Sequence, residues 1–71
     1  KPYTITKLAR LYGLSRSTLL YYDRVELLSP RGRTSSGYRL YSEEDVERLD
    51  RICSLRRTGL SIEDIKSVLR A

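Results

Sequence analysis

SRSTLLYYDR, residues 15–24, decides the fold, together with RTSSGYRLY, residues 33–41. A helix opened by Ser15 places Leu19 and Tyr22 on one stripe at 3.6-residue spacing, and the stripe extends to Glu26. The opposite side then carries four other side chains: Ser17, Leu20, Tyr21 and Arg24. The spacing predicts a helix that packs through one face and leaves the other face free to contact a partner.

The residues before this stretch end one helix and start another within three positions. Gly13 suits the left-handed residue past a helix end, and Leu14 can fold back as its apolar closing contact. Ser15 is a good N-cap. Two helices joined by so short a turn predict a helix-turn-helix, whose second helix, about Arg16 to Val25, enters the major groove of DNA.

The chain on either side predicts a first helix and a hairpin. Thr4 can cap a helix over residues 5 to about 12. After the second helix, Leu27 and Leu28 are expected in the core, and Pro30 forces the residue before it into extended geometry. Residues 33–41 then place alternating Tyr, Arg, Leu and Tyr after a polar turn that contains glycine, which predicts a two-stranded hairpin, or wing.

Two more helices are predicted in the last third of the chain. Ser42 and Asp45 form a capping-box-like start for a helix to about Thr58, and Ser61 with Asp64 repeats that signal for a fourth helix. The predicted fold class is mainly α: a winged helix-turn-helix in one domain over residues 1–71, in the order helix, helix, hairpin, helix, helix.

Charge is distributed unevenly along the 71 residues, whose net charge is +5. Residues 1–41 carry eight Lys or Arg against two acids, giving +6, whereas residues 42–71 carry six against seven, giving −1. The basic half is therefore the half expected to face a polyanion.

Several classes of function are excluded by composition. Cys53 is the single cysteine and there is no histidine, so neither an internal disulfide nor a zinc site is expected, and the serines lack the usual activating base. No glycine-rich phosphate loop is present. No apolar run approaches the roughly 20 residues that span a bilayer. We therefore expect a cytoplasmic protein that is not an enzyme and has no metal, cofactor or membrane partner.

Arginines and tyrosines supply the candidate DNA contacts. Phosphates need cations or donors, and base edges need side chains on a rigid helix. Arg16 and Arg24 bracket Tyr21 on the second helix, where they meet this need. The wing adds three more candidates: Arg33, Tyr38 and Arg39. The arginines of the third helix, which alternate with acids, are instead expected on a solvated or paired face: Arg48, Arg51, Arg56 and Arg57.

Six tyrosines occur without any phenylalanine or tryptophan, so some of their hydroxyls are expected to have partners. Tyr21 and Tyr38 are interpreted as DNA contacts. Tyr22 fits a core position and a phosphate contact equally, and both interpretations stay open. Cys53 is expected to be an inert buried thiol. The remaining tyrosines next to helix ends are expected at the rim of the core: Tyr3, Tyr12 and Tyr41.

These residues resemble the DNA-binding domain of the MerR family of bacterial transcription regulators. The resemblance covers essentially the whole chain and is most specific at two places, the Tyr21–Tyr22 pair with Asp23 and the run from Gly37 to Ser42. It implies a winged helix-turn-helix that binds a two-fold promoter operator as a homodimer and distorts DNA with an over-long spacer so that RNA polymerase can use it. The combined candidate contacts are Arg16, Ser17, Leu20, Tyr21, Tyr22, Arg24, Arg33, Tyr38 and Arg39.

The chain departs from that family at three positions and at its end. Relatives often carry Arg at Ser17 and Leu20, so Leu20 is expected to meet a thymine methyl instead. They often carry Gly at Glu26, which makes the end of the second helix less defined. Relatives continue into a long antiparallel dimerisation helix and an effector-sensing region, so residues 1–71 are expected to be a DNA-binding fragment of a longer regulator.

Two alternatives remain open at this stage. An excisionase-like module has a similar short winged fold and bends DNA during recombination. A protein-interaction module would use the apolar stripe of the fourth helix: Ile62, Ile65, Val68 and Leu69.

Overall fold

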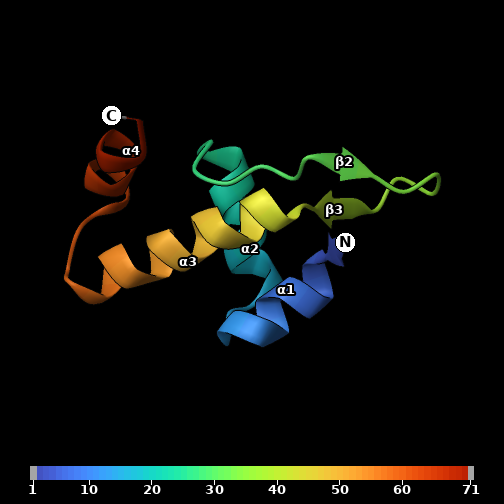
Figure 1. The fold of residues 1–71 in the computed structure, drawn as a ribbon, viewed down its shortest axis with the longest axis horizontal. Helices are drawn as coiled ribbons and strands as arrows, with labels where there is room; N and C mark the ends of the chain where they lie inside the picture. The colour runs from blue at the N-terminus through green and yellow to red at the C-terminus, as the bar shows by residue number, and fades with distance from the viewer. Residues whose placement is uncertain (1, 71) are drawn as a thin grey trace.

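The computed structural model describes residues 2–70 and places the helices in the predicted order (Figure 1). The first strand, β1, was not expected, because it has only two residues and lies directly before a helix. The elements are β1 (Tyr3–Thr4), α1 (Ile5–Tyr12), α2 (Arg16–Arg24), β2 (Gly32–Arg33), β3 (Arg39–Tyr41), α3 (Glu43–Arg57) and α4 (Ile62–Arg70). The mainly α winged helix-turn-helix predicted from the sequence is confirmed.

Local capping sets the helix boundaries where the sequence predicted them. The Thr4 hydroxyl accepts a hydrogen bond from the Lys7 amide at 3.2 Å, and Ser15 accepts one from the Thr18 amide at 3.1 Å. Gly13 has φ 66°, and the Leu14 amide donates to the Ala9 carbonyl at 2.9 Å, which closes α1. The turn between α1 and α2 is therefore held by the backbone itself.

The end of α2 corrects one prediction. Glu26 was expected on the packed stripe of that helix, but α2 ends at Arg24, and Glu26 is exposed at φ 62°. A side chain in this left-handed region costs roughly 1–2 kcal/mol, and glycine would avoid that cost. The backbone reversal that the chain needs after α2 takes precedence over helical periodicity.

The wing belongs to a three-stranded antiparallel sheet, ordered β1-β3-β2, in which β3 is central. Tyr3 pairs with Tyr41, and Arg33 pairs with Arg39. At the tip, the Thr34 amide donates to the Tyr38 carbonyl at 2.8 Å, and Gly37 takes φ 89°. Figure 1 shows the hairpin extending from one end of the molecule, with α4 at the opposite end.

The core joins residues from both halves of the helix-turn-helix with β3, α3 and α4. Tyr41 is fully buried, which corrects its expected place at the rim, because its strand lies between β1 and β2 and packs against α3. Tyr3, Tyr12 and Cys53 are only partly buried. The expected burial of Leu27 and Leu28 is confirmed. The buried apolar residues are Leu8, Ala9, Leu19, Tyr22, Leu27, Leu28, Tyr41, Leu49, Ile52 and Ile65.

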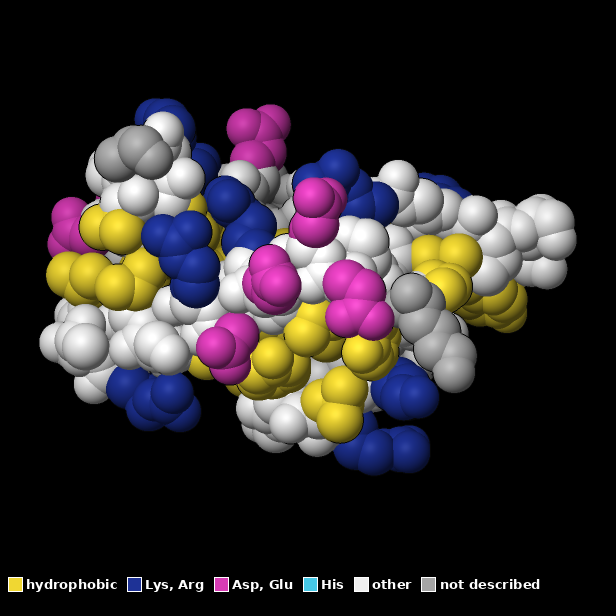
Figure 2. All heavy atoms as spheres, in the orientation of Figure 1, with side chains coloured by type: hydrophobic (Ala, Val, Ile, Leu, Met, Phe, Trp, Pro, Cys, Tyr) yellow, Lys and Arg dark blue, Asp and Glu magenta, His cyan; other side chains and the backbone are white. Residues whose placement is uncertain are grey.

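The third helix starts at a complete capping box. The Ser42 hydroxyl accepts from the Asp45 amide at 3.2 Å, while the Asp45 carboxylate accepts from the Ser42 amide at 2.8 Å. Acidic side chains gather over α3 on the face drawn in Figure 2. Within residues 2–70, no helix has both the length and the apolar character needed to cross a bilayer.

Candidate nucleic-acid interface

Strand β1 and helices α1 and α2 meet the wing at one pocket of about 350 Å³. It brings Arg16, from the start of α2, together with Tyr38 and Arg39 of the wing, which lie more than 20 positions later in the chain. Its other lining residues are Thr4, Ile5, Thr6 and Thr34. Two guanidinium groups and several hydroxyls around one hollow provide the donors that a phosphate needs.

The outward side of α2 is exposed as the spacing predicted. Ser17 and Arg24 lie in solvent, and Leu20 and Tyr21 keep 39% and 40% of their surface exposed. The Arg24 guanidinium stacks over the Tyr21 ring, 5.6 Å from its centroid. This stacking limits the motion of both side chains while leaving their polar groups accessible.

Two arginines lie side by side on the wing. Arg33 and Arg39 pair directly across β2 and β3, so their side chains leave the same face of the sheet. Like charges in directly opposed positions are destabilising. One Nη1 donor of Arg33 reaches the Gly37 carbonyl at 3.3 Å, and Nε of Arg39 reaches Oδ2 of Asp23 on α2 at the same distance. The pair therefore concentrates positive charge and ties the wing to α2.

Tyr38 is the most exposed of the large apolar side chains among residues 2–70, with 71% of its surface accessible. Its amide is fixed by a 3.0 Å hydrogen bond to the Thr34 hydroxyl. An exposed aromatic ring on an anchored backbone can pack against sugar or phosphate and donate its hydroxyl.

Tyr22 occupies the first of the two positions left open by the sequence. It is only 1% exposed, and its hydroxyl accepts a 2.9 Å hydrogen bond from Nη1 of Arg56. That hydrogen bond raises the pKa of the Arg56 guanidinium above its ordinary value. The prediction that Tyr22 contacts DNA is therefore wrong: its ring is buried in the core, and its hydroxyl is bonded to Arg56 of α3.

Two α3 arginines have structural partners that the sequence did not identify. Nε of Arg48 donates to the Leu27 carbonyl at 2.7 Å, and Arg56 donates to Tyr22. Both bonds join α3 to α2 or to the segment after it, over 21 and 34 sequence positions. No local pattern signals such a contact, because the acceptor is a backbone carbonyl or a core tyrosine distant in the chain.

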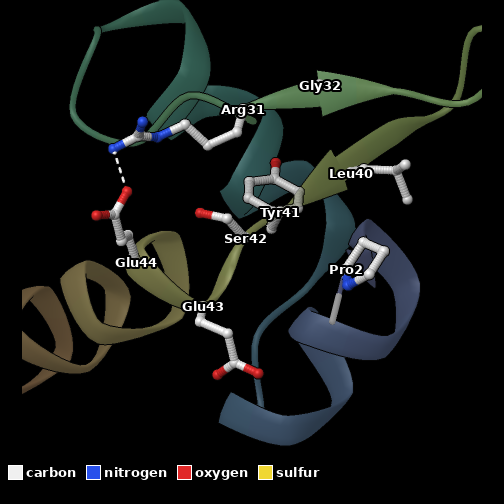
Figure 3. A pocket seen from close by; sticks show the side chains of 8 residues that line it. All are labelled: Pro2, Arg31, Gly32, Leu40, Tyr41, Ser42, Glu43 and Glu44. Carbon is white, nitrogen blue, oxygen red and sulfur yellow. Dashed lines mark ion pairs between the residues drawn. The ribbon is translucent and has the colours of Figure 1, made fainter.

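A second hollow, of about 500 Å³, lies between the sheet and the start of α3 (Figure 3). Nη2 of Arg31 forms a 2.8 Å ion pair with Glu44, and the Arg31 amide donates to Asp45 at 3.2 Å. Burial is the main cause that raises the pKa of Tyr41, whose hydroxyl has no hydrogen-bond partner among residues 2–70. Within the same residues, no cluster of His, Cys, Asp or Glu could hold a metal ion.

Cys53 has the character of a structural thiol. It is half-buried on α3, and burial raises its pKa, so the thiol stays protonated near neutral pH. The sequence interpretation of an unreactive cysteine agrees with this position.

Two helices joined by a tight turn, with a sheet-borne wing beside the second helix, define a winged helix-turn-helix. The model of the MerR HTH family of regulatory proteins matches residues 3–71. The chain belongs to this family, as the resemblance implied, and it is a MerR-type DNA-binding domain of a transcriptional regulator.

Individual relatives agree with this assignment. The transcriptional activator mta of Bacillus subtilis is 42% identical over 67 residues, which cover 94% of this chain and 26% of that protein. A MerR-family regulator from Bacillus cereus superposes with a TM-score of 0.96 at 30% identity, covering 100% of this chain and 53% of that one. HiNmlR, a MerR-family regulator bound to promoter DNA, superposes with a TM-score of 0.83 at 37% identity, covering 96% and 54%.

The chain spans between about a quarter and a half of the length of the curated relatives that it matches. Those relatives are transcriptional regulators or activators. Their family and fold favour the regulator interpretation over the excisionase-like and protein-interaction alternatives.

Proposed function

We propose that this domain binds promoter DNA by placing α2 in the major groove and the wing on the adjacent backbone. The observation that carries the proposal is the shared pocket, where Arg16 of α2 lies with Tyr38 and Arg39 of the wing. A duplex presents phosphates on both sides of a groove, so a protein that reads it needs cations on two elements at once. The basic half of the chain supplies both elements.

Each candidate has a role set by its position. Arg16 and Leu20 face outward on α2, where Arg16 can reach guanine and Leu20 can meet a thymine methyl. Ser17, Tyr21 and Arg24 flank them and are suited to phosphate oxygens. The wing contributes the remaining phosphate contacts, Arg33, Tyr38 and Arg39.

Recognition of a pseudo-palindromic operator requires two copies of the domain. We infer that the regulator acts as a homodimer, because a two-fold operator presents the same half-site twice and each half-site takes one domain. In that dimer, the two domains distort an over-long promoter spacer, and RNA polymerase responds to the changed DNA. Such a regulator acts in the bacterial cytoplasm, on the nucleoid, and catalyses no reaction.

The salt dependence of binding tests the charge-based part of this proposal. If roughly four cationic side chains of the domain neutralise phosphates, the log-log slope of affinity against salt is about −4 per domain. Fluorescence anisotropy with a labelled duplex, from low to moderate salt, measures this slope. A slope near zero contradicts the proposal.

Base readout needs a separate test, with a duplex selected from a random pool and a scrambled duplex of equal length. Leu20→Ala and Arg16→Lys are expected to reduce the preference for the selected duplex, because a good base contact contributes about 1–3 kcal/mol of discrimination. Ser17→Ala serves as the comparison on the same face. Equal losses on both duplexes would remove Leu20 and Arg16 from the reading role.

A further inference from the structure

We propose that Asp23, an acid placed within the basic interface, is a positioning residue that fixes Arg39 for a DNA phosphate. The inference rests on the proposed function and adds a residue to it. Asp23 lies on α2 and Arg39 on β3, sixteen positions apart, and Nε of Arg39 donates to Oδ2 of Asp23 at 3.3 Å. The ion pair is thus a direct link between the helix that reads DNA and the wing.

Asp23 occupies only one donor of the Arg39 guanidinium, so the donors on its outer edge stay available. Arginine carries five N–H donors in a planar fork. Asp23 accepts from Nε alone, and Arg39 has no other hydrogen bond or ion pair within residues 2–70. Both Nη groups therefore remain for a bidentate phosphate contact, and Arg39 lines the pocket that it shares with Arg16 and Tyr38.

The Asp23–Arg39 ion pair is intermediate in solvent exposure between a buried pair and a surface pair. The side chains of Arg39 and Asp23 keep 33% and 25% of their surface. A fully exposed pair would hold its geometry only weakly, because water screens it and side-chain entropy opposes it. Water screens a half-buried pair less, and its side chains have fewer alternative conformations. Arg39 is therefore already close to the conformation that it needs to bind a phosphate.

The neighbouring arginine gives Asp23 a second effect. Arg33 lies directly opposite Arg39 across the strands, and like charges in this position repel each other. The carboxylate of Asp23 offsets this repulsion on the side facing α2. Without it, Arg39 would be expected to move away from Arg33 and to lose its fixed position beside α2.

Charge and positioning predict opposite signs for the same substitution. If Asp23 acted only as a negative charge near phosphates, Asp23→Asn would strengthen DNA binding. If Asp23 positions Arg39, Asp23→Asn weakens DNA binding although it makes the protein more positive. The sign of the change therefore separates the two roles without reference to its exact size.

The experiment measures duplex affinity at fixed low salt for the wild type, Asp23→Asn and Glu63→Gln. Glu63 is exposed on α4, at the end of the molecule opposite the wing, so its substitution removes one negative charge without touching the pair. We expect Asp23→Asn to bind about fivefold more weakly, the scale of one long side chain that must be ordered on binding. Glu63→Gln is expected to bind as tightly as the wild type or slightly more tightly.

A double-mutant cycle ties the effect to Arg39. In an Arg39→Lys background, which keeps the cation but removes the Nε–H donor, Asp23→Asn is expected to cause no further loss or a small gain. Asp23→Glu, which keeps the carboxylate charge, should retain most of the affinity. Thermal melts show whether each variant is folded. If Asp23→Asn is not folded, Arg39→Lys and Asp23→Glu provide the test.

Three results would overturn the inference: unchanged or tighter binding by Asp23→Asn, an equal loss in both Arg39 backgrounds, or full affinity in Arg39→Lys. Each of these leaves DNA binding itself intact. A wild-type protein without salt-dependent duplex binding would instead contradict the proposed function, and the inference with it.

Discussion

The arginines of α3 and those of the wing are chemically identical, yet the fold uses them in opposite ways. Arg48 and Arg56 donate inward, to the Leu27 carbonyl and the Tyr22 hydroxyl. Arg33 and Arg39 instead lie opposite each other on the wing, with Asp23 as the carboxylate partner of one of them. Each of these four arginines donates one hydrogen bond to a described residue, so the two sets differ in where they lie and in which charges surround them.

The surroundings of the two sets explain this difference. Helix α3 carries five acids among its four arginines, and the acids gather on the face drawn in Figure 2. The negative charges of these acids offset the positive charges of the arginines and lower the positive electrostatic potential around α3. On the wing, the two opposed arginines raise the positive potential. Four predictions follow, from the largest expected effect to the smallest, and the first three either break this contrast or sharpen it.

Arg39→Ala is expected to have the largest effect on binding. Loss of a charged hydrogen bond to phosphate costs about 1.5–3 kcal/mol, equal to roughly 10- to 100-fold in affinity. The loss should be similar on selected and scrambled duplexes, and the salt slope should fall by about 1. Arg51→Ala, which removes an exposed arginine from α3, is the matched control in the same anisotropy titrations. Equal losses for the two variants would break the contrast between α3 and the wing.

Arg48→Ala is expected to act on stability. It leaves the Leu27 carbonyl without its 2.7 Å donor, and an unsatisfied group of this kind costs about 1–3 kcal/mol. In a domain of this size each kcal/mol lowers Tm by about 4–8 °C. Thermal unfolding followed by circular dichroism measures the change, again against Arg51→Ala. A large loss of DNA affinity at a temperature where Arg48→Ala is fully folded would contradict this structural role.

Tyr22→Phe removes only the hydroxyl that accepts from Arg56. Because Arg56 is itself exposed and can turn to water, we expect a loss of about 0.5–1.5 kcal/mol in the free energy of unfolding. Urea denaturation measures it, with DNA affinity unchanged once the variant is folded. A selective loss of DNA binding in Tyr22→Phe would show that the hydroxyl serves DNA instead of the core.

Tyr41→Phe is expected to have the smallest effect at neutral pH, because the Tyr41 hydroxyl is buried without a hydrogen-bond partner among residues 2–70. Burial raises the pKa of Tyr41 above its ordinary value of 10.0. The folded state therefore holds the phenol proton more tightly than the unfolded state, and stability falls as pH rises above 10.0 toward the folded pKa.

The fall in stability at alkaline pH separates the contribution of the Tyr41 phenol from that of other groups. Urea midpoints measured between pH 7 and pH 11 should fall less steeply for Tyr41→Phe than for the wild type. Tyr12 also has a raised pKa, chiefly from burial, so Tyr12→Phe reports how much of the remaining slope comes from a second phenol. Identical pH profiles for the wild type and Tyr41→Phe would contradict the burial of this hydroxyl.

The helices and their boundaries were predictable because their signals are local. Thr4, Ser15 and Ser42 cap with their own hydroxyls, and Gly13 ends α1 at a positive φ. The wing was predictable from alternating residues around a glycine turn. The outward side of α2 followed from helical spacing, which depends only on backbone geometry.

The errors occur where distant residues meet. Glu26 was assigned to the packed stripe of α2 but is an exposed residue past the end of that helix, and Tyr41 was expected at a rim that β1 and β2 enclose. The two-residue strand β1 exists only because β3 offers it a partner. Each of these depends on a neighbour that spacing along the chain does not identify.

By itself, the sequence determined the four helices, the turn between the first two, the wing and the basic half of the chain, since capping, periodicity and charge are properties of neighbouring residues. Only the tertiary structure decided that Tyr22 belongs to the core, that Arg48 and Arg56 are structural, and that Asp23 contacts Arg39. The physical reason is that a hydrogen bond requires its two partners within about 3 Å, and packing alone brings residues 16 to 34 positions apart to that distance.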